Sequence, residues 1–228
     1  MHVLGIVGSA RKDRHTNTLV NRVIGDMRSY TGEVSAEIVH TAAGTFQPCR
    51  VVCSDYCSTH PYCCSISDGA TDVLDRMTRA DALVIGAPQY FRAPPAGFHA
   101  MIERLQAMFF FQETRGRGDM PSPVAGKPCG LVAVAEYSNP HAILEYLHDF
   151  CTLLKMRPVL LDTFPYLGVA GQGDIENDEI FRPFERSKDL ARALVEQVRS
   201  RTERGAKTQK QTLVSRDGRA GVVKSNDR

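Results

Sequence analysis

Short apolar runs recur along the first 160 residues, and polar turns separate them from segments with helical periodicity. These runs predict strands at residues 3–7, 36–39, 82–86, 130–135 and 159–161. Continuous rather than alternating apolarity is typical of strands that are buried on both faces, as in a parallel sheet.

Between the runs, apolar residues recur every three or four positions and predict helices. The predicted helices begin near Asn17, cover residues 73–77, 98–109 and 143–154, and end with a last helix over about 178–201. Strands that alternate with helices imply βαβ units and a doubly wound parallel sheet. Five such strands favour the flavodoxin-like order 2-1-3-4-5, so the predicted fold class is α/β.

The predicted domain covers residues 1–203 and contains a cysteine-rich loop at residues 48–68. Residues 204–228 carry many basic side chains and no apolar periodicity, which predicts a mobile basic tail. The alternative is an arm that embraces a neighbouring subunit.

Composition and charge narrow the functional classes. The chain has 228 residues and a net charge of +2, which is too small to indicate nucleic-acid binding. No segment approaches the roughly 18 apolar residues of a membrane span, and the N-terminus has no basic region typical of a secretion signal. We therefore expect a cytoplasmic protein without a membrane partner.

The segment after the first strand reads GSARKDRHTNTL, from Gly8 to Leu19. It lacks both the GxGxxG dinucleotide fingerprint and the GxxxxGK[ST] pattern of ATP and GTP sites. It offers the hydroxyls of Ser9 and Thr16, the guanidinium of Arg11 and helix N-terminal amides, which suit a phosphate monoester. The alternative is that Thr16 or Asn17 simply caps the helix and Arg11 is solvated.

This segment resembles the GSxRxxxxTxxL phosphate signature of the NADPH-dependent FMN reductase family. Residues 81–86, 87–91 and 98–104 resemble the same family, and the similarity extends over about residues 1–200. The resemblance implies FMN as cofactor and a phosphate site formed by Ser9, Arg11, His15 and Thr16. His15 stands where many relatives have Asn or Ser.

The same resemblance assigns the flavin's ring and ribityl chain to two further loops. The residues concerned are Pro88, Gln89, Tyr90 and Phe91 after the third strand, and Glu136, Tyr137 and Ser138 after the fourth. A flavin needs apolar or aromatic walls and nearby polar groups, which these loops supply. Ordinary core packing is the alternative for Tyr90 and Phe91. The loop at 136–139 lacks the glycines that relatives often carry.

Five of the seven cysteines fall in one segment: Cys49, Cys53, Cys57, Cys63 and Cys64. In a reducing compartment such a group is more often a metal or redox site than a disulfide framework. The segment resembles the compact cysteine motif of the iron–sulfur flavoproteins within the same family, including Pro48 before it and Asp68 after it.

The spacing of the cysteines departs from that motif. Three residues instead of two separate the first three cysteines. The gap after Cys57 selects Cys63 as the last ligand, whereas counting back from Asp68 selects Cys64. Three interpretations stay open: a [4Fe–4S] cluster held by four of the five cysteines, zinc or redox-active thiols, and unligated cysteines.

The sequence therefore predicts an FMN-dependent oxidoreductase, specifically an electron-transfer iron–sulfur flavoprotein that exchanges electrons with a ferredoxin-type donor. One alternative is a cluster-free reductase of FMN or quinones that uses NAD(P)H, and another is a zinc-holding binding module without enzymatic activity. The flavin performs the redox chemistry, so no catalytic side chain is named. The resemblance also implies a homodimer or homotetramer.

Overall fold

The computed structural model describes residues 1–41, 46–50, 54–60, 62–108 and 122–217, with residues 54 and 205–217 as backbone only. Its centre is a parallel sheet in the order β2-β1-β3-β4-β5, which confirms the predicted flavodoxin-like topology. The strands are β1 (His2–Val7), β2 (Ser35–His40), β3 (Ala82–Pro88), β4 (Pro128–Ala135), β5 (Arg157–Pro158) and β6 (Val169–Gln172).

The fifth position of the sheet differs from the prediction because two short strands share it. β5 pairs with the start of β4, and β6 pairs with the end of β4. The predicted strand at 159–161 follows β5 directly, and its first amide still bonds to β4, since Val159 N donates to Cys129 O at 2.9 Å. Gly168 lets the chain return to the sheet: its φ is +154°, and a Cβ would lie 2.3 Å from the Leu131 carbonyl oxygen.

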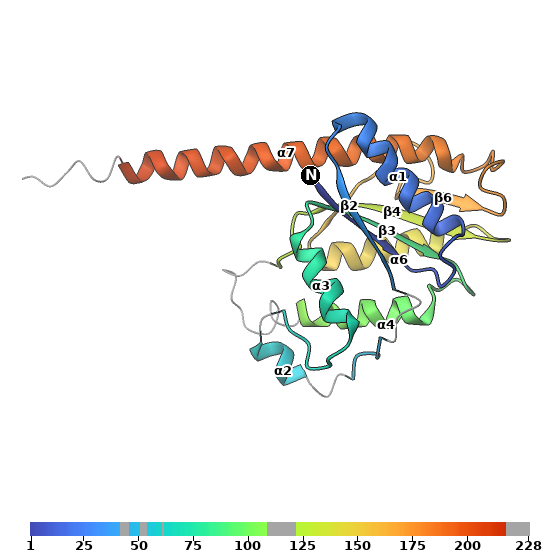
Figure 1. Ribbon diagram of the computed structural model, residues 1–228, viewed down its shortest axis with the longest axis horizontal. Coiled ribbons are helices and arrows are strands. Elements are labelled where there is room, and N and C mark those ends of the chain that lie inside the picture. The colour runs from blue at the N-terminus through green and yellow to red at the C-terminus, as the bar shows by residue number, and fades with distance from the viewer. Residues whose placement is uncertain (42–45, 51–53, 61, 109–121, 218–228) are drawn as a thin grey trace, which may run out of the picture.

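Helices cover both faces of the sheet (Figure 1). One face carries α1 (His15–Thr31) and α7 (Pro183–Asp217), and the other carries α3 (Gly69–Arg79), α4 (Ala96–Arg104) and α6 (His141–Leu153). The apolar sides of these helices and both faces of the central strands form two hydrophobic clusters, one on each side of the sheet. This double burial explains the continuous apolar runs.

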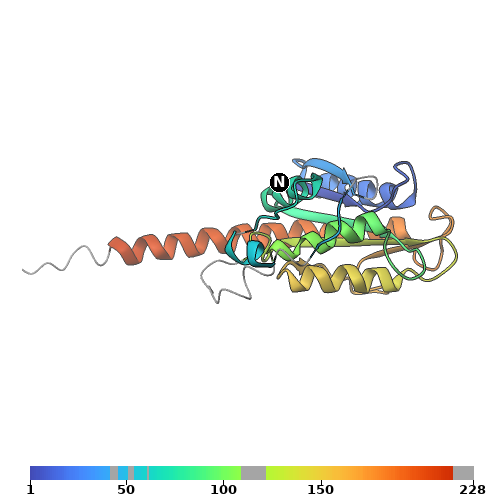
Figure 2. The ribbon, with the colours of Figure 1, turned by 90° about the horizontal axis from the view of Figure 1, so that it is seen from below.

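Several helices differ from the prediction in their bounds, and the differences at α1, α2 and α7 bear on the site and on the tail. α1 begins at His15, two residues before the predicted start, and a short helix, α2 (Ser54–Thr59), lies within the segment predicted as a cysteine-rich loop. α7 continues to Asp217, so residues 204–217 are helical rather than a tail, and its far half projects beyond the other elements (Figures 1 and 2). No proline follows Pro183 to end this helix. Residues 218–228 lie outside the described part.

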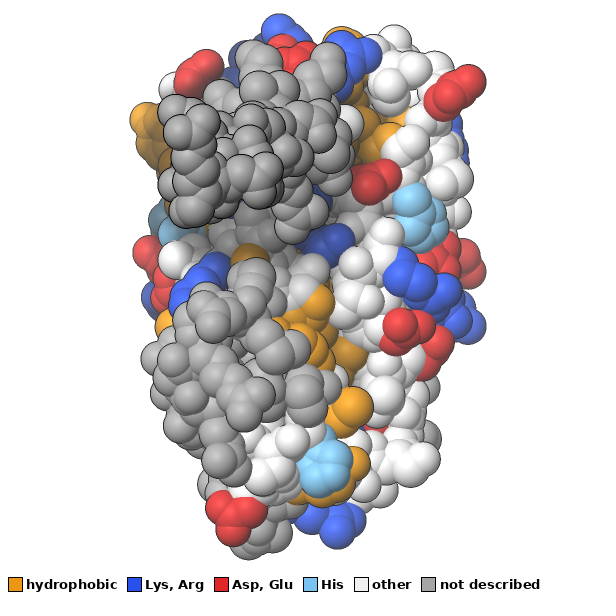
Figure 3. Space-filling view, turned by 90° about the vertical axis from the view of Figure 1, so that its left-hand side faces the viewer, with side chains coloured by type: hydrophobic (Ala, Val, Ile, Leu, Met, Phe, Trp, Pro, Cys, Tyr) orange, Lys and Arg blue, Asp and Glu red, His pale blue; other side chains and the backbone are white. Residues whose placement is uncertain are grey.

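The helices and the charged side chains of the described part of the chain bear on the sequence-based expectations about partners. Within the described ranges, no helix has the length and apolar character required to cross a bilayer. On the end of the molecule drawn in Figure 3, described basic and acidic side chains are interspersed. This mixture agrees with the small net charge of +2.

Candidate functional site

A cavity of about 740 Å³ opens where β1, β3 and β4 end. Its lining consists of Ser9, Arg11, Arg14, His15, Thr16, Pro88, Gln89, Tyr90, Phe91, Arg92, Val134, Ala135, Glu136, Tyr137 and Ser138. β1 lies between β2 and β3, so the chain reverses its direction across the sheet at this point. Doubly wound sheets bind their ligands in the crevice at such a switch point.

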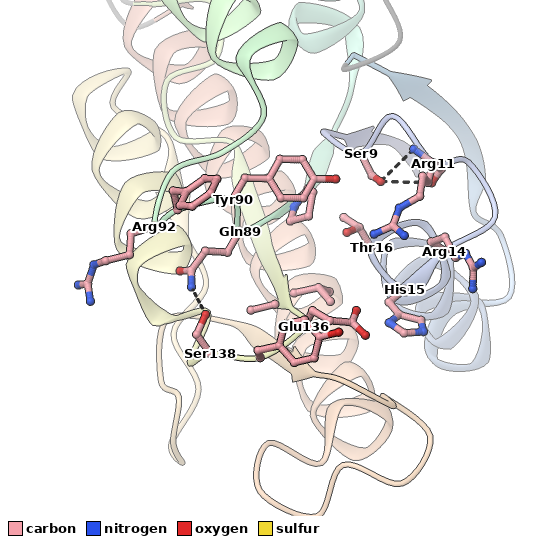
Figure 4. Close-up of a pocket in the computed structure, with 15 residues that line it drawn as sticks. Ser9, Arg11, Arg14, His15, Thr16, Gln89, Tyr90, Arg92, Glu136 and Ser138 are labelled. Carbon is pink, nitrogen blue, oxygen red and sulfur yellow. Dashed lines mark hydrogen bonds between the residues drawn. The ribbon is translucent and has the colours of Figure 1, made fainter.

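The turn between β1 and α1 forms one wall of the cavity (Figure 4). Ser9 is buried, and its Oγ accepts a hydrogen bond from Arg11 N and donates one to Arg11 O, both at 3.2 Å. The two bonds hold the turn in a fixed shape. In Figure 4, Arg11 and Thr16 lie beside Ser9, whereas the guanidinium groups of Arg14 and Arg92 point outward on opposite sides.

The N-terminus of α1 opens at this wall. Arg14 occupies the N-cap position without a side-chain cap, so the alternative in which Thr16 or Asn17 caps the helix is wrong. The first amides of a helix have no partner within the helix, and its dipole places positive potential there. The first turn contains no acidic residue that would neutralise this potential. The wall therefore suits an anion.

The opposite wall is a tight turn after β3. Tyr90 and Ala93 exchange two backbone hydrogen bonds of 2.8 and 2.9 Å, and Phe91 and Arg92 between them both have positive φ, at 49° and 64°. Two residues in the left-handed region are typical of a type I′ turn. The turn exposes Phe91 completely and Tyr90 by 43%, so the alternative of core packing for these residues is wrong.

The loop after β4 closes the cavity between the two walls. Gln89 Nε2 donates to Ser138 Oγ at 2.7 Å and to Asn139 O at 3.2 Å, which joins the loops that follow β3 and β4 (Figure 4). Tyr137 is 90% exposed and adds a third accessible aromatic ring to the lining. The cavity thus combines an anion-binding end with an open, partly aromatic end.

Every residue that the sequence predicts for the flavin site lines this one cavity, and the role of each as an FMN ligand stays a prediction. Sequence reasoning missed Arg14, Arg92, Val134 and Ala135. The last two are the final residues of β4, and the rule that ligands bind beyond the carboxyl ends of the strands is the signal that could have found them.

The cysteine segment lies apart from the cavity, between β2 and α3. Cys57 is buried, Cys49 and Cys64 are partly buried, and Cys63 is exposed, whereas Cys53 falls outside the described residues. Over the ranges given above, no three metal-ligating side chains form one group. The donor chemistry fits an iron–sulfur cluster or zinc, because thiolates are the preferred ligands of both, but the described sulfurs are not assembled around one point.

Arg104 holds the C-terminal end of this segment. It is the last residue of α4 and its side chain is fully buried. Its Nε donates to Cys64 Sγ at 3.0 Å, Nη1 donates to Gln47 O at 3.0 Å and to Asp68 Oδ2 at 2.7 Å, and Nη2 donates to Ile66 O at 2.8 Å. Four hydrogen bonds therefore fix both the guanidinium and the chain around it.

Asp68 is the partner of Arg104 and also the N-cap of α3. Its carboxylate accepts hydrogen bonds from Ala70 N and Gln47 N, both at 3.0 Å. Burial acts to raise the pKa of Asp68, but these two amides and Arg104 outweigh it and hold the pKa below its usual value. The carboxylate is therefore ionised at neutral pH.

Glu103, the residue before Arg104, holds the other end of the segment. Its Oε2 accepts a hydrogen bond from Cys49 N at 2.9 Å, and its Oε1 lies 3.5 Å from His99 Nε2. His99 Nδ1 lies 2.7 Å from the Tyr146 hydroxyl, and burial together with the charge of Glu103 raises the pKa of Tyr146 to about 12. Adjacent residues of α4 thus hold both ends of the cysteine segment.

Comparison with known proteins agrees with this architecture. Residues 1–165 match the model of the NADPH-dependent FMN reductase family. The chain is 30% identical over 202 residues to an iron–sulfur flavoprotein of Archaeoglobus fulgidus, covering 86% of this chain and 94% of that protein. It is 25% identical over 207 residues to an iron–sulfur flavoprotein of Methanocaldococcus jannaschii, covering 87% of this chain and 98% of that protein.

Solved structures show the same fold at low sequence identity. RosB with bound 8-demethyl-8-formylriboflavin-5′-phosphate matches with a TM-score of 0.67 and 14% identity, covering 100% of this chain and 90% of that one. The flavodoxin-like WrbA-like protein from Agrobacterium tumefaciens matches with a TM-score of 0.54 and 13% identity, covering 87% of this chain and 98% of that one.

Proposed function

Because the chain belongs to the NADPH-dependent FMN reductase family and is an FMN-dependent oxidoreductase, we propose that it is an electron-transfer iron–sulfur flavoprotein. FMN occupies the cavity at the carboxyl ends of β1, β3 and β4, and a [4Fe–4S] cluster is held by the cysteine segment. The observation that carries the proposal is the cavity itself, where an uncapped helix N-terminus faces aromatic side chains across the switch point of the sheet.

At the phosphate end, Ser9 and Thr16 donate from their hydroxyls and Arg11 donates from its guanidinium. The backbone amides at the start of α1 add donors and positive potential, so the site binds a dianionic phosphate with its charge compensated. His15 lies at the same helix start and completes this end of the cavity.

At the ring end, Tyr90, Phe91 and Tyr137 supply aromatic surface. Gln89 holds the two loops together, and Pro88, Glu136 and Ser138 complete the lining. These side chains offer apolar surface and polar groups that would orient a planar ring. When bound, FMN accepts one or two electrons and so connects one-electron with two-electron carriers.

The cluster would be held by Cys49, Cys53, Cys57 and one of Cys63 and Cys64. Support comes from the two iron–sulfur flavoprotein relatives, which the chain matches over most of its length. A metal centre draws its ligands together as it binds, so sulfurs that stand apart are compatible with the proposal. The cluster would pass single electrons to or from a ferredoxin-type donor.

A cluster-free NAD(P)H-dependent reductase of FMN or quinones is the second candidate. The observation that favours it is the lack of a three-ligand metal group among the described residues. The zinc-holding binding module rests on the same thiols without a flavin.

One anaerobic preparation of the full chain distinguishes these functions. We expect FMN, iron and acid-labile sulfide to copurify, with the absorption of a cluster in addition to that of the flavin. FMN without iron, together with bleaching of the flavin by NADPH or NADH, would establish the cluster-free reductase instead. Zinc without flavin would establish the binding module. Size-exclusion chromatography of the same sample tests the expected homodimer or homotetramer.

A further inference from the structure

Two adjacent cysteines, Cys63 and Cys64, compete for one position at the end of the cysteine segment. They differ in their surroundings, because Cys63 is exposed whereas Cys64 is partly buried against Arg104. We propose that Arg104 selects Cys64, rather than Cys63, as the sulfur ligand at this end and acts as its fixed hydrogen-bond donor. The inference rests on the proposed function, in which the segment holds a cluster.

The direction of the Arg104 Nε–H bond is set by the rest of the guanidinium. The two Nη atoms are occupied by Asp68, Gln47 O and Ile66 O, so the planar group cannot rotate without breaking three hydrogen bonds. Its remaining bonded donor, Nε, points at Cys64 Sγ at 3.0 Å. A side chain with no exposed surface has no alternative partner in water.

Arg104 forms an ion pair with Asp68, but Asp68 does not fully neutralise the positive charge that Arg104 presents to the Cys64 sulfur. Asp68 also accepts hydrogen bonds from two backbone amides and stands at the N-terminus of α3, whose dipole favours a negative charge. The negative charge of the Asp68 carboxylate is therefore stabilised by two backbone amides and the helix N-terminus as well as by Arg104. The Cys64 sulfur thus accepts a hydrogen bond from a charged donor, whereas Cys63 is exposed to solvent.

Residues of α4 also contact the other end of the cysteine segment. Glu103 accepts a hydrogen bond from Cys49 N, and Arg104 donates one to Cys64 Sγ, so adjacent residues of α4 contact both ends of the segment. Outer partners that orient a ligand in this way are part of how a metal site is built. Hydrogen bonds to ligand sulfurs also tune the reduction potential of a cluster, since they stabilise its more negative, reduced form.

The test compares Cys63→Ser with Cys64→Ser in the full chain. Both variants are loaded anaerobically with FMN, ferrous iron and sulfide, and iron and sulfide are quantified per bound FMN. Bound FMN reports that the sheet is folded. We expect Cys63→Ser to retain the iron and sulfide of the wild type and Cys64→Ser to lose most of both. Loss in Cys63→Ser with retention in Cys64→Ser, or equal loss in both, would overturn the inference.

Arg104→Lys and Asp68→Asn test the donor role through the midpoint potential of the cluster. Lysine keeps a positive charge beside Asp68 but removes the Nε–H bond, so the midpoint moves to a more negative value. Asp68→Asn removes the counter-charge and moves the midpoint to a more positive value. If the Arg104→Lys variant binds no FMN, the midpoint potential of the Asp68→Asn variant is used to test the donor role. An unchanged midpoint potential in that variant overturns the donor role of Arg104. A wild-type chain that binds FMN but no iron would instead overturn the proposed cluster, and this inference with it.

Discussion

Gly86 of β3 packs directly against α1 because it has no side chain, and replacing it with alanine tests how the cavity is built. A Cβ at this position of β3 would lie 2.6 Å from Val20 Cγ2, 3.1 Å from Thr16 Cγ2 and 3.3 Å from Val132 Cβ. Val20 and Thr16 are buried residues of α1, so the added methyl group pushes the first turns of α1 away from β3.

The expected magnitude follows from the packing. Inserting a methyl group into a close-packed core costs about 1–3 kcal/mol. In a domain of this size, each kcal/mol lowers Tm by about 2–4 °C, so Gly86→Ala lowers it by about 2–12 °C. The first turn of α1 is also the anion-binding wall of the cavity. A loss of about 1.4 kcal/mol in binding would weaken the affinity for FMN about tenfold.

Gly25→Ala is the matched control because it makes the same chemical change within α1. A Cβ at Gly25 meets no atom within 4 Å, and alanine in a helix interior stabilises by about 0.5–1 kcal/mol relative to glycine. Urea unfolding of the FMN-free protein and fluorescence titration with FMN measure both quantities. A Gly86→Ala variant as stable as the wild type, with unchanged FMN affinity, would refute the reasoning.

Three further predictions concern single charged groups. Arg11→Gln removes a charged hydrogen bond worth about 1.5–3 kcal/mol and so weakens FMN binding about 10- to 150-fold. Lys12→Gln is the control, because Lys12 is a neighbouring exposed residue outside the cavity lining, and it leaves the affinity within about twofold. Equal effects of the two substitutions in an FMN titration would contradict the phosphate site. The pKa of Asp68 is lowered in the folded protein, so its carboxylate contributes stability that is complete above the ordinary pKa of 3.8 and is lost as the pH falls through the pKa of the folded state. The difference in unfolding free energy between wild type and Asp68→Asn should therefore shrink from about pH 5 to about pH 3. A constant difference would show that the folded protein does not stabilise the ionised carboxylate. Lys127 is buried, and its Nζ donates hydrogen bonds to two carbonyls at the C-terminus of α3. Lys127→Met therefore lowers the free energy of unfolding in urea by about 1–3 kcal/mol. An unchanged urea midpoint would show that these two hydrogen bonds do not stabilise the fold.

The sequence was sufficient to predict the sheet order and most of the residues that line the cavity. Buried parallel strands have continuous apolar runs, and their order follows from the doubly wound topology, so the loops after β1, β3 and β4 had to meet at one edge. The exposure of Phe91 was not predictable in this way. It depends on the tight turn that Phe91 forms with Arg92, in which both residues have positive φ.

Other features depended on tertiary contacts that leave no periodic signal. The fifth position of the sheet is divided between β5 and β6, and the close approach of Gly168 to Leu131 at this place is not indicated by any local pattern. The extension of α7 to Asp217 was missed because a polar, charged segment without an apolar stripe was interpreted as a tail. The spacing of the cysteines could not distinguish Cys63 from Cys64, because the difference between them comes from Arg104 on a distant helix.

The lining of the cavity comes from the turns that follow β1, β3 and β4, and it includes no described residue of the connection between β2 and α3. A substitution in the described part of the cysteine segment therefore changes the thiols that this segment offers without replacing a side chain of the cavity lining.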